Sequence, residues 1–304
     1  MVIDSHAHYN NSAYKKLFRY LTYDKDGYAL REGDRDRLFQ ALLEANIPYS
    51  IEPGVSLQSC QDVLALAAQY PGRIFPAIGV HPTRSIFEKW SERRKIAEYA
   101  DMSGVIAIGE IGLDYHYKRG EQHRLKQHLW FLYQLNLAWK RKKPVILHVR
   151  DAHKDVLRIL RWHPARKLGG VIHCFYGSKE IAEQYLKLGY HIGIGGSVLQ
   201  PEERAKDLWG AIQQIPLDRI LVETDAPFIL PYCKDVIQPK LLRRARNTSL
   251  ILPAVIKKIA ALKGCSPAEV EQATTENTIR LFQLPIEVKT EYDGIGRNPC
   301  YDET

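Results

Sequence analysis

Five apolar runs in the sequence each lead directly into a histidine, a glutamate or an aspartate. They lie at residues 2–8, 105–110, 145–148, 171–173 and 220–225. Runs rich in Val and Ile are typical of strands that are buried on both faces of a parallel sheet. In a (β/α)8 barrel, the carboxyl ends of such strands meet on one face and carry the active-site residues. The runs therefore predict a barrel that gathers metal-binding side chains at one end.

Strand-like and helix-like segments alternate along the chain, as expected for a parallel sheet with crossover helices. Candidate strands lie at residues 2–8, 49–55, 74–80, 104–110, 144–149, 170–175, 191–197 and 219–225. Helical patterns lie between them at residues 33–46, 57–70, 89–101, 121–142, 152–163, 178–188 and 202–214, and two more follow at 249–263 and 267–282. The eight units predict an α/β fold of the TIM (β/α)8 barrel class. We expect one domain at residues 1–284 and a polar C-terminal tail at residues 285–304.

Composition and cysteine usage indicate a soluble globular protein with reduced cysteines. Hydrophobic residues make up 45% of the 304 and charged residues 26%, which is ordinary for a soluble globular protein. No apolar run approaches the roughly 18 residues that cross a bilayer, and strand-like residues follow Met1 at once, which argues against a signal peptide. The five cysteines are scattered and form no C-x-x-C pair, so neither a disulfide framework nor a thiolate zinc site is indicated. We predict a cytoplasmic protein with no membrane association and no obligate protein partner.

The formal net charge of +8 permits attraction to a polyanion. Basic residues cluster at 140–143, at 161–167 and at 240–246. The first two clusters are typical of a solvated surface, whereas the third follows soon after Asp225 and is the better candidate for nucleic-acid contact. Residues 10–32 form a long connection rich in tyrosine and charge, which lies on the active-site face if the barrel is correct. This connection either shapes substrate entry or is simply an insertion.

His6 and His8 form the strongest local motif. Residues two apart on a strand share a face, so both imidazoles can point at one ion. Neutral imidazole suits zinc, nickel or iron. A pair of structural histidines is the alternative for this motif taken alone. Asp4 lies on the same face and is placed to orient a ligand.

Three further ligand candidates come from later strands. Glu110 follows Ile106 and Ile108 on one strand face, where a lone carboxylate would be a costly buried charge. A metal removes that cost, and between two ions Glu110 is the natural bridging ligand; a salt bridge to an inward Arg or Lys is the alternative. His148 and His173 fall at equivalent positions of the fifth and sixth strands, which favours ligation over two unrelated structural histidines.

Asp225 ends the eighth predicted strand, beside the first strand across the barrel closure. It can ligate a metal and accept a proton from an attacking water, and Glu223 shares its face. Four histidines and two carboxylates exceed the needs of one tetrahedral ion and suit two ions about 3.5–4 Å apart. We therefore predict a hydrolase with two divalent metal ions (Mg, Mn or Zn) and with Asp225 and Glu110 as catalytic residues. The predicted ligands are His6, His8, Glu110, His148, His173 and Asp225.

Candidate substrate-binding residues are His81, Arg150, Tyr115 and Tyr176. His81 follows the third strand and is either an acid or hydrogen-bond donor that faces substrate, or a structural loop histidine. Arg150 can reach a phosphate or pair with a neighbouring carboxylate. The two tyrosines, with Tyr9, come just past ligand-bearing strands, where aromatic rings either stack a base at about 1–3 kcal/mol each or pack at the barrel mouth.

The motifs, taken in order, resemble a known family. They are Asp4-Ser5-His6-Ala7-His8, Ile78-Gly79-Val80-His81-Pro82, Ile108-Gly109-Glu110-Ile111-Gly112-Leu113-Asp114-Tyr115, Gln134-Leu135-Asn136-Leu137-Ala138, Pro144-Val145-Ile146-Leu147-His148-Val149-Arg150-Asp151-Ala152, His173-Cys174-Phe175-Tyr176-Gly177 and Glu223-Thr224-Asp225-Ala226-Pro227-Phe228. Over residues 2–284 the chain resembles the TatD-type metal-dependent deoxyribonucleases of the amidohydrolase superfamily. Each motif alone is weak, and their order and spacing are specific.

The resemblance implies a TIM barrel that hydrolyses phosphodiester bonds in DNA, often as a magnesium-dependent exonuclease in DNA repair or degradation. Single-stranded DNA or 3′ ends are the expected substrates. One ion would be bound by His6, His8, Glu110 and Asp225, and the second by Glu110, His148 and His173. The chain departs from the family at residues 246–249, which read Arg-Asn-Thr-Ser without the family's Glu-Pro. That departure bears on the substrate more than on metal binding.

Two other functions stay open at this point. A related amidohydrolase could act on a small-molecule ester, phosphoester or amide at the same two-metal site. No lysine closes a ligand-bearing strand, so the carboxylated-lysine bridge of several small-molecule members is not indicated. A basic nucleic-acid-binding scaffold with a structural metal is the non-catalytic alternative, and its metal site would be closed rather than open.

Overall fold

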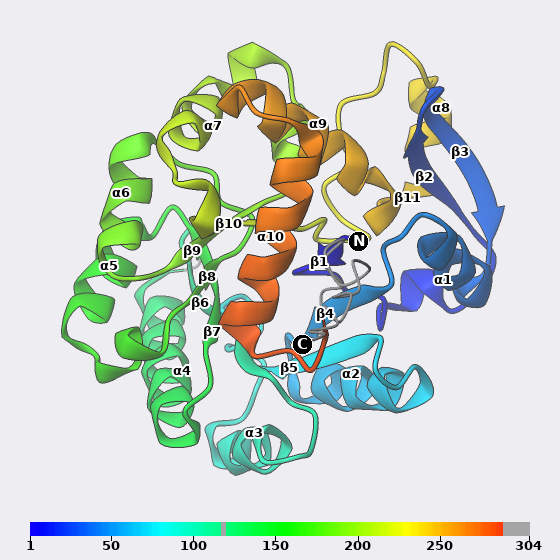
Figure 1. Ribbon diagram of the computed structural model, residues 1–304. Coiled ribbons are helices and arrows are strands. Elements are labelled where there is room, and N and C mark those ends of the chain that lie inside the picture. Colours follow the sequence, from blue (N-terminus) through cyan, green and yellow to red (C-terminus); the bar gives the residue numbers. More distant parts are fainter. Residues whose placement is uncertain (117–119, 288–304) are drawn as a thin grey trace, which may run out of the picture.

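The computed structural model describes residues 1–116 and 120–287. Within these ranges, eight parallel strands form one sheet in the order β1-β4-β5-β6-β7-β8-β9-β10 (Figure 1). Their bounds are β1 (Ile3–Asp4), β4 (Tyr49–Pro53), β5 (Ile74–Ile78), β6 (Ala107–Asp114), β7 (Val145–Arg150), β8 (Gly170–Ile172), β9 (His191–Ile194) and β10 (Ile220–Val222). The sheet closes where Ala7 pairs with Ala226 in parallel and the Ser5 N–H donates to the Val222 carbonyl at 3.0 Å. The predicted TIM barrel is confirmed.

The nine predicted helices all occur, with ends shifted by a few residues. They are α1 (Arg35–Glu44), α2 (Leu57–Gln69), α3 (Arg93–Ala100), α4 (Gly120–Arg141), α5 (His153–Trp162), α6 (Lys179–Lys187), α7 (Glu202–Gln214), α9 (Leu252–Lys263) and α10 (Pro267–Phe282). Helical spacing explains them; α5, for example, buries Val156, Leu157 and Leu160 on one face. The four-residue α8 (Pro239–Leu242) was not predicted, because it is too short to show a period.

None of the helices in the described ranges combines the length and the apolar composition that crossing a bilayer demands.

Alternation along the strands decides which side chains enter the barrel. On β7, Val145 and Leu147 pack outward against the helices, whereas Ile146 belongs to a separate inner cluster. His148 therefore shares the inner face with Ile146. Phe282 and Leu284, at the end of α10, complete the inner cluster, and Figure 1 shows α10 passing across the strands. Apolar packing thus fills the amino-terminal end of the barrel and leaves the opposite end for polar residues.

Residues 10–32 differ from the predicted loop. They contain a short 3-10 turn and the antiparallel strands β2 (Phe18–Asp24) and β3 (Gly27–Gly33), and β2 also pairs in parallel with β11 (Ala245–Arg246). We call these three strands the accessory sheet. The hairpin turns at Gly27, whose φ of +102° suits glycine. The third strand could not be inferred from the local sequence, because it lies more than 200 residues away.

Strand β6 also differs from its prediction at 104–110. It begins at Ala107 and runs to Asp114, so Glu110 lies inside the strand rather than at its end. The register against β7 shifts between Ile108 and Ile111. Gly112 permits this close pairing, because a Cβ built on it would lie 2.0 Å from the His148 carbonyl oxygen. The consequence is that Asp114, not Glu110, comes last on the strand.

Among the described residues, Cys60, Cys174, Cys233 and Cys265 are free. Cys300 lies outside those residues. The predicted tail at 285–304 also falls outside them from residue 288 onward.

Glu52, on β4, is a fully buried carboxylate next to the polar end of the barrel. Its Oε2 accepts the Tyr9 N–H at 2.7 Å, and its Oε1 accepts the Ser50 hydroxyl at 3.0 Å. Burial raises the pKa of Glu52 from 4.5 to about 8, against the opposing influence of His8. Between these two values the native state binds more protons than the unfolded state. The free energy of unfolding therefore falls as pH rises through this window.

We expect Glu52→Gln to abolish this decrease of the free energy of unfolding with pH. The glutamine amide does not titrate, and it can accept from the Tyr9 N–H and donate to the Ser50 hydroxyl. Relative to wild type, the free energy of unfolding of the variant should rise by up to about 1.4 kcal/mol per pH unit between roughly pH 5 and 8, and level off above about pH 8. Urea unfolding of the metal-free proteins at several pH values measures this difference. The exposed Glu98→Gln provides a matched control. Parallel curves for Glu52→Gln and wild type would contradict the prediction.

Candidate metal centre

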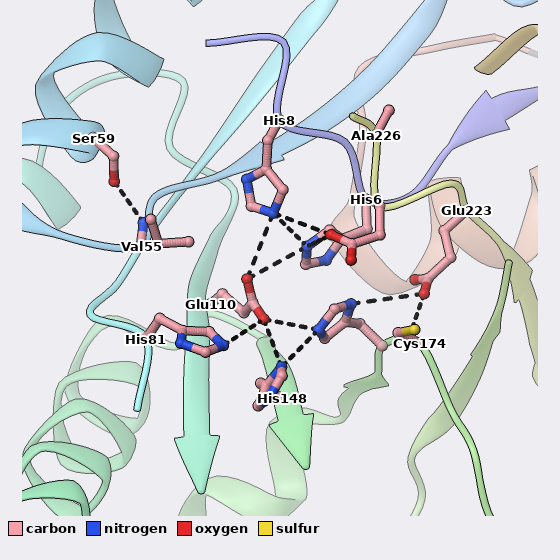
Figure 2. Close-up of polar contacts among 12 residues, drawn as sticks. His6, His8, Val55, Ser59, His81, Glu110, His148, Cys174, Glu223 and Ala226 are labelled. Carbon is pink, nitrogen blue, oxygen red and sulfur yellow. Dashed lines mark hydrogen bonds and ion pairs between the residues drawn. The ribbon is translucent and has the colours of Figure 1, made fainter. Parts of the chain in front are cut away.

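All six predicted ligands lie together at the polar end of the barrel, around Glu110. The Glu110 Oε2 lies 3.6 Å from the Nε2 atoms of both His6 and His8. Its Oε1 lies 2.8 Å from His173 Nε2 and 3.0 Å from His148 Nδ1. Figure 2 shows the Glu110 carboxylate between His6 and His8 on one side and His148 on the other. The two oxygens of one side chain thus face different histidine pairs, which is the arrangement that a bridging carboxylate requires.

Asp225 lies on the His6 and His8 side of the cluster. Its Oδ1 is 3.4 Å from His8 Nε2 and 3.7 Å from His6 Nε2. The Asp225 side chain is 16% exposed and that of Glu110 only 4%, so Asp225 lies nearer to solvent. Among the residues that the structure describes, there are three sets whose potential ligand atoms all lie within 4.8 Å of one another: His6, His8 and Asp225; His6, Glu110 and His173; and His81, Glu110 and His148. Imidazole nitrogens with carboxylate oxygens form a donor set that fits divalent ions such as zinc and manganese.

Carboxylates on the outer sides of two histidines, a hydrogen-bond partner for His148 and a longer ion-pair contact for His173, leave the inner nitrogens ready for a metal. His148 Nε2 lies 3.0 Å from Asp114 Oδ2, and His173 Nδ1 faces Glu223 Oε1 at 3.7 Å. An ionised carboxylate only accepts hydrogen bonds, so these outer nitrogens carry the protons. The inner nitrogens then keep their lone pairs, as a ligand needs. His6 Nδ1 is buried with no hydrogen-bond partner.

His81 has the opposite proton arrangement. Its Nδ1 accepts the Thr83 backbone N–H at 3.1 Å and lies 2.8 Å from the Thr83 hydroxyl. In the neutral ring the proton therefore sits on Nε2, which lies 3.3 Å from Glu110 Oε1. Burial lowers the pKa of His81, which favours the neutral form. Although His81 lies within reach of an ion, this tautomer makes it a hydrogen-bond donor rather than a ligand.

The charges of the cluster depend on one another. Burial opposes ionisation of Glu110, but His173, His81 and His148 outweigh it and hold its pKa well below the ordinary value. Burial likewise lowers the pKa of His6. For His148, burial is outweighed by hydrogen bonds to Asp114 and Glu110, and its pKa rises. The centre therefore keeps an ionised carboxylate in the interior by surrounding it with imidazoles.

Asp4 holds the backbone of two ligand segments rather than an imidazole ring. Its Oδ1 accepts the backbone N–H groups of His6 and Thr224, both at 3.1 Å. Its Oδ2 accepts the hydroxyls of Thr224 at 2.5 Å and Ser249 at 2.6 Å. Burial raises the pKa of Asp4 to about 7. Asp4 therefore ties the segment that carries His6 to the one that carries Asp225.

Two buried glutamines on α4 position the loops that carry site residues. Gln134 accepts the Val80 N–H at 2.6 Å and donates to the Val80 carbonyl, next to His81. Gln127 makes the same pair of bonds to the backbone of Asp114, both at 2.9 Å. The sequence analysis assigned neither role. Their spacing of seven residues, which places two polar side chains on the buried face of one helix, was the available signal.

The remaining predicted substrate residues have different surroundings. The Tyr115 hydroxyl donates to Asp155 at 2.8 Å, and the Arg124 guanidinium lies 4.4 Å from its ring centre. Tyr9 is fully buried, with its hydroxyl 2.7 Å from Ser249 Oγ, and packs as a core residue. Tyr176 is 57% exposed, although its hydroxyl donates to the Arg204 carbonyl. Arg150 is exposed at the end of β7.

Phe228 is an aromatic residue at the site that the sequence analysis did not single out for substrate contact. Its ring is centred 6.0 Å from that of His8, and the residue is 51% exposed. An exposed ring beside a ligand is positioned to contact whatever enters the centre.

We expect Asp114→Asn to lower metal affinity by about 10–100-fold, the usual effect of losing a group that orients a ligand. The neutral amide oxygen is a weaker acceptor for the proton on His148 Nε2 than the carboxylate, so His148 Nδ1 becomes a less basic and poorer ligand. Calorimetric titration of metal-free protein with Mn²⁺ or Zn²⁺ measures the change. Asp151→Asn, an exposed aspartate that pairs with His116, is the matched control. Equal affinities for Asp114→Asn and wild type would exclude the orienting role.

Comparison with known proteins gives a consistent set of relatives. A family model described as TatD related DNase matches residues 3–283. A 3′-5′ ssDNA/RNA exonuclease TatD from Pectobacterium carotovorum is 35% identical over 255 residues, which cover 83% of this chain and 95% of that protein. An uncharacterized metal-dependent hydrolase, YabD, from Bacillus subtilis is 31% identical over 284 residues, which cover 93% and 100%. The crystal structure of a TatD homologue, YJJV, from Escherichia coli K12 superimposes with a TM-score of 0.78 at 28% identity and covers 93% of this chain and 98% of that one.

Proposed function

Because this chain belongs to the TatD related DNase family, we propose that it is a metal-dependent hydrolase that cleaves phosphodiester bonds in DNA, as an exonuclease on single strands with free 3′ ends. The observation that carries the proposal is the position of Glu110, whose two oxygens face different histidine pairs. The similarity to a 3′-5′ ssDNA/RNA exonuclease, 35% identical over 255 residues, supports the same substrate class.

We assign the ligands to two divalent ions. His6, His8, Glu110 and Asp225 would hold the first, and Glu110, His148 and His173 the second. When bound, such ions supply Lewis acidity toward phosphodiester oxygens and toward water. Magnesium, manganese and zinc are the candidates, because imidazole and carboxylate donors accept all three.

Two residues of this chain have proton-handling roles in the proposed reaction. Asp225 accepts a proton from the attacking water, because its carboxylate lies nearer to solvent than that of Glu110. A bond forms between phosphorus and the water oxygen while the bond from phosphorus to the sugar oxygen breaks. The leaving oxygen takes up one proton, which balances the one that Asp225 receives. His81 donates its Nε2–H to a phosphate oxygen and so stabilises the negative charge that develops there.

End-labelled single-stranded DNA tests the proposal. We expect stepwise shortening with Mg²⁺ or Mn²⁺ and none in EDTA. An oligonucleotide whose last 3′ linkages are phosphorothioates should resist, whereas the same modification at the 5′ end should have little effect. Failure of the metal-loaded, folded protein to cleave any oligonucleotide would reject the nuclease. Turnover of small esters that excess DNA does not inhibit would then favour a small-molecule hydrolase.

A further inference from the structure

A groove rich in basic residues lies between the accessory sheet and the segment that follows α8. It encloses about 690 Å³. Six cationic side chains line it, with a single carboxylate, Glu32. We call it the basic groove, and its cations are Lys15, Lys16, Arg19, Arg243, Arg244 and Arg246. Figure 1 shows β2, β3 and β11 with α8 at one edge of the barrel.

Most of the positive charge in the basic groove is not neutralised by the protein. Arg19 pairs with Glu32 at 3.3 Å, and both side chains are about half exposed. None of the other five cations forms an ion pair within residues 1–116 and 120–287. Arg246 Nε is buried with no hydrogen-bond partner. A concave surface with this charge attracts a polyanion.

Both walls of the basic groove are connected to the metal centre through short chain segments and hydrogen bonds. Asn247 follows Arg246, and its Nδ2 donates to the Thr224 carbonyl at 2.9 Å, one residue before Asp225. The Tyr14 hydroxyl, from the opposite wall, donates to the Asn247 carbonyl. Tyr9, which follows His8, bonds Ser249. Both walls therefore extend from the chain segments that carry first-ion ligands.

A second hollow adjoins the basic groove. It encloses about 460 Å³ and shares Arg243 with the basic groove; Arg204, Leu230 and Tyr232 also line it. Leu230 lies two residues after Phe228, whose half-exposed ring contacts His8. Aromatic rings next to basic side chains are the usual surface for unpaired bases and their phosphates. A strand can thus pass from His8 along Phe228 to Arg243 and into the basic groove.

We propose that the basic groove binds the sugar-phosphate backbone of the single strand on the 5′ side of the scissile bond. This inference rests on the proposed function and adds a second binding site to it. Residues 10–32 then help to bind the substrate, a role that their sequence left open, because the accessory sheet forms one wall of the basic groove. Oligonucleotides long enough to reach the groove bind more tightly than di- or trinucleotides, which contact the centre alone.

Arg243→Ala/Arg244→Ala tests the groove by binding, without turnover. Each lost phosphate contact lowers the salt dependence of single-strand binding by about 0.7. Two contacts therefore reduce the slope of log affinity against log salt by about 1.4, and weaken binding of a 12-mer about 25-fold at roughly 0.1 M salt. Fluorescence anisotropy with labelled oligothymidylates of about 3 and about 12 nucleotides in EDTA measures both quantities. In the variant, most of the affinity gained between the short and the long oligonucleotide should disappear.

The control removes the same charge from the other end of the barrel. Arg166 and Lys167 are exposed in the short turn that precedes β8, so Arg166→Ala/Lys167→Ala should leave the slope unchanged. Equal losses of affinity in both variants, or no loss in Arg243→Ala/Arg244→Ala, would overturn the proposal that the basic groove binds the single strand. So would wild-type affinity that does not increase with length. If the protein binds longer oligonucleotides more tightly through Arg243 and Arg244 but cleaves no DNA, the binding role of the basic groove would stand. The proposed nuclease activity would then be rejected.

Discussion

Replacing Asp225 with Asn is expected to lower the rate of oligonucleotide cleavage by about 10²–10⁴-fold, the usual contribution of a general base. The amide cannot accept the proton of the attacking water, and it is a weaker, neutral ligand beside His8 and His6. The fold should survive, because Asp225 has a φ of +53°, a left-handed conformation that Asn adopts as readily as Asp. The loss should therefore appear in the rate and not in the stability.

Single-turnover cleavage at saturating metal separates this effect from weakened metal binding. Circular dichroism melting curves of the variant and wild type check the fold. Asp207→Asn, on the exposed face of α7, removes a similar charge far from the chemistry and should cleave normally. Cleavage by Asp225→Asn at nearly the wild-type rate would reject the assigned role, and unfolding of the variant would show that Asp225 is structural.

The clustering of the six candidate ligands could be predicted because a barrel constrains where charge can be buried. His148 and His173 stand two residues after inward apolar positions, so the period of two on a strand places them inside. A histidine or carboxylate there requires partners, and other members of the same set supply them. The predicted strand ends were less accurate: β1 ends at Asp4 and β10 at Val222, so His6, His8 and Asp225 lie just beyond their strands. Glu110 was expected at a strand end, but the shifted register of β6 carries the strand on to Asp114.

The residues that support the ligands were harder to find, since their roles depend on contacts between distant segments. Asp4 reaches Ser249, 245 residues away, and Gln134 reaches Val80, 54 residues away. Such polar side chains look like ordinary surface or loop residues until the fold brings them together. The accessory sheet has the same explanation, because β11 supplies a strand that no pattern within residues 10–32 contains.

Substrate contacts are the least constrained by sequence. An exposed tyrosine can pack against several different neighbours at similar free energy. Its position after a ligand-bearing strand therefore did not show whether it packs at the barrel mouth or contacts substrate. Tyr9 is buried and Tyr115 is bonded to Asp155, whereas Phe228 stands open beside His8. The tautomer of His81 depends on a backbone N–H, that of Thr83, which donates to its Nδ1. No sequence pattern carries that information.

Replacing Glu110 with Gln is expected to reduce the bound metal from the two proposed ions to at most one. Both Glu110 oxygens face imidazole nitrogens, Oε2 toward His6 and His8, and Oε1 toward His148 and His173. In the Glu110→Gln variant one of these oxygens becomes an NH₂ group, which donates hydrogen bonds and has no lone pair for a metal. Either orientation of the amide therefore leaves one histidine group without its carboxylate ligand.

Elemental analysis of protein dialysed against a small excess of Mn²⁺ or Zn²⁺ measures the stoichiometry. We expect the affinity of the lost ion to fall by more than the roughly 10–100-fold that orienting groups contribute, because Glu110 would contact the metal directly. Oligonucleotide cleavage should fall with it. Glu98→Gln, an exposed helical glutamate, controls for the loss of one charge. If Glu110→Gln retained two ions at wild-type affinity, the bridging assignment would be wrong, and the two histidine groups would have to bind their ions independently.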